Sequence, residues 1–270
     1  MKFSNLICFT FILLSVSVYA TDSIPKPKHH IYVIAHRGAH NAIPENTLEA
    51  YRKAIALSCD FVEIDVRTTK DNKIVSVHNS TIDAYCIDGT KGPVKAMTLT
   101  ELKQLDIGSR IDEKWQAVEI PTFDEILETC KGKTGIYLDL KDASIDVLLK
   151  TLKQYGMMKN VIWYVPYNVL KKVANVRDKF KGTFIMPDPG ENNWNEVITY
   201  LKPQVIASDM NAITVDLINM AHTSHIKVFV DEKLGTEAEW KKMIAMGIDG
   251  IQTDSPEKLV RFLKRLYKEG

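Results

Sequence analysis

Residues 32–55 read YVIAHRGAHNAIPENTLEAYRKAI, and this stretch joins an expected strand to an expected helix through an unusually charged turn. Its first four residues are apolar and mostly β-branched or aromatic, as in a buried strand, and apolar residues recur at helical spacing from Thr47 onward. The turn begins His36-Arg37-Gly38, although a turn that only reverses the chain needs neither an imidazole nor a guanidinium. The charged turn therefore predicts a functional site at the carboxyl end of this strand.

The same alternation of strand and helix recurs along the chain. Apolar runs typical of short strands occupy residues 31–36, 61–66, 135–140, 161–165, 183–186, 205–209, 227–230 and 250–254. Helical patterns lie between most of them, at residues 47–57, 144–155, 167–180, 194–202, 214–222, 237–246 and 256–268. Strands that alternate with helices pair in parallel through right-handed crossovers, so the pattern predicts an α/β fold, a (β/α)8 TIM barrel. An open doubly wound sheet is the alternative.

The second and third core strands are separated by an insertion of approximately residues 80–121. It follows a possible extra strand at residues 73–79 and contains a helical pattern at residues 98–106. Long connections are uncommon unless they are functional, and in a barrel an insertion after a strand falls on the face that carries the site. No linker-like tract divides residues 21–270, which we interpret as a single domain.

Residues 1–20 have the pattern of a signal peptide. Lys2 precedes an apolar stretch, and Val18-Tyr19-Ala20 offers small residues for cleavage. The stretch is too short and wrongly flanked for a membrane span, and no other stretch is long enough to be one. We therefore expect an exported protein, periplasmic or secreted, without a transmembrane segment.

The mature chain has balanced charge and few cysteines. Loss of Lys2 takes the formal net charge from +1 to 0, because residues 1–20 contain no acidic residue. This balance argues against a nucleic-acid partner and leaves a small molecule as the expected one. Cys59, Cys86 and Cys130 are an odd number without a CxxC pair, which favours three buried thiols over one disulfide.

Several charged residues lie inside otherwise apolar strands. Glu63 and Asp65 are two residues apart and so share one face of their strand, as do Asp139 and Lys141. Buried carboxylates are costly unless their charge is cancelled, and Lys141 can cancel only one. Three carboxylates at neighbouring strand ends indicate a site for a divalent cation, Mg²⁺ or Ca²⁺. An ion-pair network that closes the top of the barrel is the alternative.

Two histidines are expected at the same rim. His36 and His78 each end an apolar run, so together they could supply a general acid and a general base, although either one could also be structural. Arg37 and Lys141 add positive charge suited to an anionic oxygen. A zinc site is less favoured, because the chain has no HxH or HExxH spacing. The set indicates chemistry at a phosphoryl group.

The motifs HRG, PENT, EIDV, TKDN and VSVHN, at residues 36–79, resemble the glycerophosphodiester phosphodiesterase family in order and spacing. The resemblance continues through TLTELKQLDIG, IPTFDEIL, YLDLK and IDGIQTDSP, and thus spans most of residues 32–256. It implies a phospholipase-C-like phosphodiesterase barrel that uses a divalent cation. It also implies a role for each matching residue: acid/base catalysis for His36 and His78, metal binding for Glu63, Asp65 and Asp139, and phosphate binding for Arg37 and Lys141.

The chain departs from the family pattern at three places. Asn79 follows His78 where the family has an aspartate, and the arginine expected shortly after it is missing. Phe229 stands where a tryptophan would line the alcohol pocket, which implies a substrate-binding role for it, and Asp231 and Glu232 add negative charge next to it.

Two further motifs have more ordinary interpretations. Glu45 could join the rim or interact with the start of the following helix, with Asn46 or Thr47 as cap. Asp254 is interpreted as part of a turn before a helix that begins near Pro256.

These features predict an exported, metal-dependent phosphodiesterase. It would hydrolyse glycerophosphodiesters to glycerol 3-phosphate and an alcohol by general acid/base catalysis. One alternative is the same chemistry on an inositol-type or intact-lipid phosphodiester, which the change at Phe229 motivates. A second alternative is a non-catalytic barrel that binds a phosphorylated ligand, which only Asn79 supports.

Overall fold

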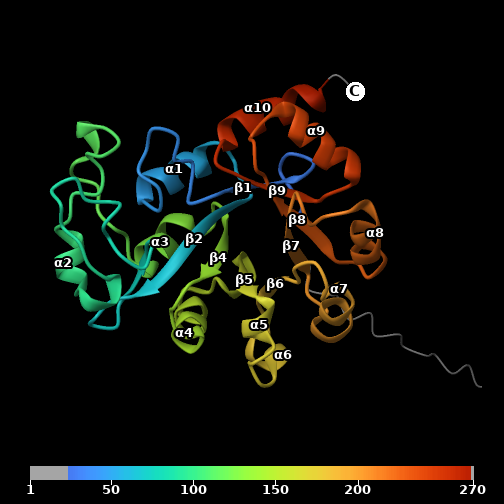
Figure 1. The fold of residues 1–270 in the computed structure, drawn as a ribbon, viewed down its shortest axis with the longest axis horizontal. Coiled ribbons are helices and arrows are strands. Elements are labelled where there is room, and N and C mark those ends of the chain that lie inside the picture. Colours follow the sequence, from blue (N-terminus) through green and yellow to red (C-terminus); the bar gives the residue numbers. More distant parts are fainter. Residues whose placement is uncertain (1–23, 269–270) are drawn as a thin grey trace, which may run out of the picture.

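The computed structural model describes residues 24–268 and shows a ring of parallel strands surrounded by helices (Figure 1). The core strands are β1 (Tyr32–Ala35), β2 (Phe61–Thr68), β4 (Gly135–Leu140), β5 (Val161–Pro166), β6 (Phe184–Asp188), β7 (Val205–Asp209), β8 (Lys227–Asp231) and β9 (Gly250–Thr253). They are hydrogen-bonded in the order β6-β5-β4-β2-β1-β9-β8-β7, and the two ends of this order, β6 and β7, lie side by side. This order confirms the barrel and excludes the open doubly wound sheet.

Helices cover the outside of the barrel. The longer ones are α1 (Leu48–Ala56), α3 (Phe123–Cys130), α4 (Ile145–Tyr155), α8 (Val215–Thr223), α9 (Glu237–Met246) and α10 (Pro256–Leu266). All of these except α3 were predicted from the sequence. Thr47, Thr122, Thr214 and Thr236 cap α1, α3, α8 and α9 through their side-chain oxygens, which accept from backbone N–H groups of the first turn.

Two predicted helices are interrupted. The pattern at residues 167–180 forms two single turns, α5 (Tyr167–Leu170) and α6 (Val176–Lys179), because Asn175 adopts a left-handed conformation with φ +56° that a continuous helix cannot contain. The pattern at residues 194–202 begins as α7 (Trp194–Glu196) and continues as the π-helical segment η4 (Val197–Leu201). Both predictions of one continuous α-helix were wrong in this respect.

The insertion forms a small lobe beside the β1–α1 connection, at the left of Figure 1. The preceding strand β3 (Ile74–Ser76) pairs antiparallel with β2. The lobe then contains η1 (Val94–Ala96), α2 (Leu99–Lys103) and η2 (Glu113–Trp115), which surround a separate apolar cluster that includes Ile82, Leu102 and Ile107. The Trp115 indole N–H donates to the Ala42 carbonyl at 2.8 Å, which ties the lobe to the connection that carries the HRG motif.

Alternate strand residues face the barrel interior and form layers. A lower layer of apolar side chains includes Tyr32, Phe61, Phe184 and Phe229. Two or four residues further along the same strands, the interior positions change from apolar to charged or polar. The interior is therefore a packed core below and a polar site at the carboxyl ends of the strands.

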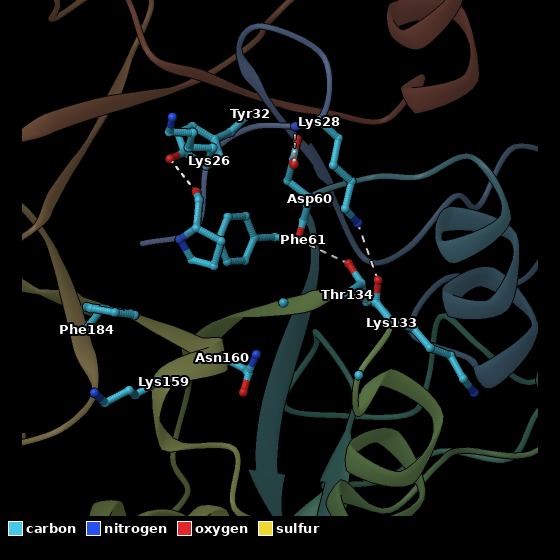
Figure 2. Close-up of a pocket in the computed structure, with 13 residues that line it drawn as sticks. Lys26, Lys28, Tyr32, Asp60, Phe61, Lys133, Thr134, Lys159, Asn160 and Phe184 are labelled. Carbon is cyan, nitrogen blue, oxygen red and sulfur yellow. Dashed lines mark hydrogen bonds between the residues drawn. The ribbon is translucent and has the colours of Figure 1, made fainter. Parts of the chain in front are cut away.

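The segment before β1 closes the opposite end of the barrel (Figure 2). The Tyr32 hydroxyl donates to the Pro25 carbonyl at 2.6 Å, and the Asp60 carboxylate accepts from the backbone N–H groups of Lys28 and Val33, each at 2.8 Å. A hollow of about 230 Å³ at this end is bordered by lysines, and the Lys28 ammonium reaches the Lys133 carbonyl at 3.4 Å. These contacts hold the end of the barrel together.

The remaining sequence expectations can be placed on this fold. The expected signal peptide, residues 1–20, lies outside the described residues. Within residues 24–268 no helix has the length and hydrophobicity needed to cross a membrane. The three cysteines are free thiols; Cys59 and Cys130 are buried as expected, whereas Cys86 is partly exposed.

Candidate active site

A cavity of about 300 Å³ lies at the carboxyl ends of the strands. Its lining residues come from the turns that follow β1 and β3 and from strands β4 to β9, namely His36, Arg37, His78, Tyr137, Asp139, Tyr164, Asp188, Ala207, Ser208, Asp209, Phe229, Val230, Asp231 and Gln252. The other sequence-predicted residues, Glu45, Glu63, Asp65 and Lys141, contact members of this set. The structure thus brings all the predicted site residues to one rim.

The backbone conformation of the HRG turn sets the directions of its side chains and N–H groups. Arg37 and Gly38 have φ values of +50° and +83°, and a Cβ on Gly38 would lie 2.7 Å from the Ala50 Cβ in α1. Only glycine allows this close approach of the turn to the helix. As a result the Arg37 N–H points inward and donates to Glu63 Oε2 at 2.6 Å, while the Arg37 guanidinium pairs with Glu45 at 3.1 Å.

Three carboxylates form the centre of the rim. One ligand oxygen from each of Glu63, Asp65 and Asp139 lies within 4.8 Å of the others, and Asp65 stands opposite Asp139 in the β2–β4 register. Burial, with the neighbouring Asp65 charge, raises the pKa of Glu63 well above its usual range, and burial also raises the pKa of Asp139, against the effect of Lys141. The buried Asp65 Oδ1 has no partner among the described residues other than the Lys141 ammonium.

Lys141 is the nearest positive charge to these carboxylates. Its Nζ lies 2.7 Å from Asp139 Oδ2 and 3.1 Å from Asp65 Oδ1. Burial disfavours the ammonium, but the two carboxylates outweigh this and raise the pKa of Lys141. Arg37 Nε lies 3.8 Å from Asp65 Oδ2, so two cations face three carboxylates and the set keeps excess negative charge. Oxygen ligands with excess negative charge fit a hard divalent cation.

Asn46 orients the central carboxylate. Its side-chain N–H donates to Asp65 Oδ2 at 2.7 Å, and its Oδ1 accepts from the hydroxyls of Tyr51 and Ser76, both at 2.9 Å. Thr47, and not Asn46, caps α1. Sequence reasoning treated Asn46 only as a possible cap and missed this role. Glu45 forms an ion pair with Arg37 and therefore lies at the rim, which is the first of its two predicted positions.

His36 is held by an aspartate from the end of the chain. The Asp254 carboxylate accepts hydrogen bonds from His36 Nδ1 at 2.6 Å and from His40 Nε2 at 3.0 Å. Burial of His36 opposes its protonation, but the Asp254 hydrogen bond and the nearby Glu63 raise its pKa to about 9. Asp254 and His40 were not recognised from the sequence, because Asp254 was interpreted as a turn residue only. The signal available in the sequence was the position of Asp254 at the end of the predicted strand 250–254.

His78 is held by an amide in place of a carboxylate. Asn79 Oδ1 lies 2.9 Å from His78 Nδ1 and, as an acceptor, fixes the proton on that nitrogen. The backbone N–H of Asn79 donates to the Tyr85 hydroxyl oxygen at 3.2 Å, so the insertion supports this residue. The Asn79 departure therefore keeps the orientation of the imidazole and removes only the negative charge beside it.

The departure at Phe229 affects the floor of the cavity. Phe229 is only 2% exposed, and its ring centroid lies 5.0 Å from that of Tyr32 in the barrel core. Asp231 lines the cavity. Glu232 does not, since it accepts from the Trp240 indole and the Thr253 hydroxyl behind the rim. Only one of the two added acids therefore changes the cavity.

A nearly closed parallel barrel whose strand ends combine buried carboxylates, two histidines and two cations is typical of TIM-barrel hydrolases of phosphoric diesters. Comparison with known proteins identifies the family. Residues 36–258 match the glycerophosphoryl diester phosphodiesterase family, and the chain belongs to it. A glycerophosphodiester phosphodiesterase of Caldanaerobacter subterraneus is 30% identical over 245 residues, which cover 86% of this chain and 98% of that protein.

Solved structures share the fold. A phosphodiesterase of Oleispira antarctica, solved with the product sn-glycerol-3-phosphate, aligns with a TM-score of 0.77 and 24% identity over 86% of this chain and 96% of its own. A glycerophosphodiester phosphodiesterase of Thermotoga maritima aligns with a TM-score of 0.67 and 27% identity over 87% and 99%. The chain is thus similar to these proteins over nearly their whole length.

Proposed function

We propose that this phosphodiesterase depends on a divalent cation and hydrolyses small glycerophosphodiesters to glycerol 3-phosphate and an alcohol. The observation that carries the proposal is the convergence of Glu63, Asp65 and Asp139 within 4.8 Å, beside two histidines that line one cavity. The product named in the Oleispira antarctica structure supports the choice of glycerol 3-phosphate.

The three carboxylates would hold the cation, Mg²⁺ or Ca²⁺. The raised pKa values of Glu63 and Asp139 support this assignment, because they reflect buried negative charge that the neighbouring cations do not fully compensate. When bound, such a cation polarises a non-bridging phosphate oxygen and offsets its charge. Asn46 holds the Asp65 carboxylate in the orientation that the set requires.

The remaining side chains bind the phosphate and move protons. Arg37 and Lys141 attract the anionic phosphoryl oxygens, and Arg37 can do so with two parallel N–H groups. His36 and His78 border the cavity from two sides of the carboxylates, so one can take the proton of the attacking hydroxyl while the other gives a proton to the leaving alkoxide. Asp254 and Asn79 keep the two imidazoles oriented.

A small substrate is favoured over an intact lipid. A cavity of about 300 Å³ is at the lower end of the size of small-molecule sites. Its carboxylate-lined wall is unsuited to acyl chains, whose transfer from water requires apolar surroundings. A purely binding role loses its one support, because Asn79 still holds the His78 ring. The signal-peptide pattern of residues 1–20 supports action outside the cytoplasm, on diesters in the periplasm or medium.

The experiment is hydrolysis of glycerophosphocholine by residues 21–270, with EDTA and after return of Mg²⁺ or Ca²⁺. We expect cation-dependent release of glycerol 3-phosphate, and a fall of about 10²–10⁴-fold in kcat for His36→Asn. His225→Asn, at an exposed position after α8, is the matched control and should keep full activity. Folded, cation-loaded protein that releases no glycerol 3-phosphate from this diester or from glycerophosphoinositol would refute the proposal, as would turnover unaffected by EDTA.

A further inference from the structure

Three aspartates form one wall of the active-site cavity. None of the three has a role in the proposed reaction. Asp188, Asp209 and Asp231 are the last residues of β6, β7 and β8, and all three line the cavity. Asp209 and Asp231 stand opposite each other in the β7–β8 register. Each faces the interior by the same alternation that directs Glu63 and Asp65 inward on β2. We call this set the acidic wall.

The acidic wall has no ion-pair partner among residues 24–268. Other carboxylates at the rim form ion pairs, such as Asp139 with Lys141 and Asp254 with His36. None of the ion pairs found between described residues includes a member of the acidic wall. Burial at the rim raises the pKa of Asp231, and the nearby Asp209 and Asp254 add to this effect, whereas His36 opposes it. The wall therefore concentrates negative charge that a bound cationic group would relieve.

Turn formation explains only part of this wall. Asp209 Oδ1 accepts from the backbone N–H groups of Asn211 at 2.7 Å and Ala212 at 3.1 Å, and Asp188 Oδ1 accepts from Gly190 at 2.9 Å. Asparagine would satisfy the same turns through its own side-chain oxygen. Asp188 Oδ2 also accepts from the Tyr164 hydroxyl at 3.2 Å. None of these neutral donors requires a negative charge on its acceptor.

A separate observation indicates that this wall receives a ligand. Gln252 lines the cavity next to Asp231 and is only 8% exposed, yet its Oε1 accepts no hydrogen bond from any described residue. An unpaired buried acceptor costs free energy, which a hydrogen-bond donor on the ligand, such as a primary ammonium or a hydroxyl, would recover. A quaternary ammonium has no N–H group, so it would be attracted by the carboxylates and aromatic rings alone. Tyr137 and Tyr164, whose ring centroids are 5.8 Å apart, border the same space. Aromatic rings and carboxylates together attract ammonium groups.

The cavity is thus divided by charge. Arg37 and Lys141 stand with the candidate cation site on β1, β2 and β4, whereas the acidic wall stands on β6, β7 and β8. We propose that the acidic wall, with Tyr137, Tyr164 and Gln252, is a subsite for a positively charged group of the diester, so that the enzyme selects diesters bearing an ammonium over neutral or anionic ones. This subsite rests on the proposed function, since it assigns the second half of a substrate whose phosphate lies at the cation site.

The test compares two substrates that differ in charge alone. Glycerophosphocholine and the 3,3-dimethylbutyl ester of glycerol 3-phosphate have the same shape, because carbon replaces the quaternary nitrogen. We expect kcat/KM to be at least about tenfold higher for the choline ester, and the ratio to fall as salt is added. Glycerophosphoethanolamine should behave like the choline ester. A ratio near one for the native enzyme would overturn the subsite.

Variants test whether the acidic wall causes the preference for the choline ester. Asp209→Asn and Asp231→Asn should each lower the ratio of the two kcat/KM values about threefold to tenfold, with the turns preserved. Asp216→Asn, an exposed residue in the first turn of α8, is the matched control and should leave the ratio unchanged. An unchanged ratio in the Asp209→Asn, Asp231→Asn double variant would also overturn the proposal.

The experiment distinguishes an error in the proposed function from an error in the subsite. Hydrolysis of neither ester would refute glycerophosphodiester turnover, whereas hydrolysis of both at equal kcat/KM would refute only the subsite. Binding is measured independently by NMR titration with choline and with 3,3-dimethyl-1-butanol. Preference for choline, lost in the double variant, supports the subsite even without turnover, and equal binding of the two contradicts it.

Discussion

Replacement of Gly38 by alanine tests the reason why the HRG turn contains glycine. Gly38 has φ +83°, and an added Cβ would lie 2.7 Å from the Ala50 Cβ and 2.9 Å from the Ala50 carbonyl carbon. The change therefore has two separate costs, a backbone conformation that L-residues avoid and a collision with α1. Both displace the turn that aims the Arg37 N–H at Glu63.

The magnitude follows from these two costs. The left-handed conformation costs an L-residue about 1–2 kcal/mol. Overpacking against a helix backbone that cannot move aside costs about 1–3 kcal/mol more. Gly182→Ala is a matched control, because Gly182 has φ +85° and nothing within 4 Å of an added Cβ. Gly182→Ala should therefore cost only the conformational part, and the difference between the two variants measures the collision.

The assay is urea unfolding followed by circular dichroism, together with thermal melting. The difference between the variants should be about 1–3 kcal/mol, and each kcal/mol should lower Tm by about 2–4 °C in a domain of this size. Gly38→Ala should also lower kcat/KM, whereas Gly182→Ala should not, because its turn precedes β6 at the other end of the barrel. Equal destabilisation by the two variants would refute the close approach as the reason for glycine.

Three further predictions concern charge and hydrogen bonding. Because folding raises the pKa values of Glu63 and Asp139, their stability contribution is complete below the pKa of the unfolded carboxyls and is lost as pH rises through the folded values. Bound Ca²⁺ or Mg²⁺ should therefore raise Tm much more at about pH 8 than at about pH 5, and a shift independent of pH in thermal melts would contradict this. Asn46→Ala should cost about 1–3 kcal/mol in urea unfolding and weaken Ca²⁺ binding in calorimetry, because Asp65 loses its donor; unchanged affinity would show that Asn46 does not orient the site. Asp60→Ala leaves two backbone N–H groups unpaired and should lower the unfolding free energy by about 2–4 kcal/mol without changing the choline preference, and a stability loss below about 1 kcal/mol would contradict the closing role of the N-terminal segment.

The barrel and much of its rim could be predicted because they depend on short-range patterns. Strand length and the alternation with helices define the parallel sheet, and a period of two places Glu63 and Asp65 on one face without reference to any other segment. The short segments α5 and α6 show the limit of this reasoning. A left-handed residue such as Asn175 interrupts a helix that apolar spacing alone would continue.

Contacts between distant segments could not be predicted in the same way. His36 and Asp254 are 218 residues apart, and they meet because barrel closure places β9 beside β1. Asn46 was expected only as a possible helix cap, but its left-handed backbone, with φ +55°, turns its side chain toward Asp65. Each role depends on which segment packs nearby, and local propensity contains no information about that.

The sequence by itself determined which chemical groups stand at the strand ends, because strand period and motif order are properties of neighbouring residues. Its predicted strands end at residues 186, 209 and 230, so Asp188, Asp209 and Asp231 lie at or just beyond strand ends, although only Asp231 was noted there, as added negative charge. Only the tertiary structure decided which carboxylates are paired. Lys141 reaches Asp139 and Asp65, but no described cation reaches the acidic wall. Charge compensation acts over a few ångströms in space, so only folding could decide which carboxylates of the cavity have a cation beside them and which do not.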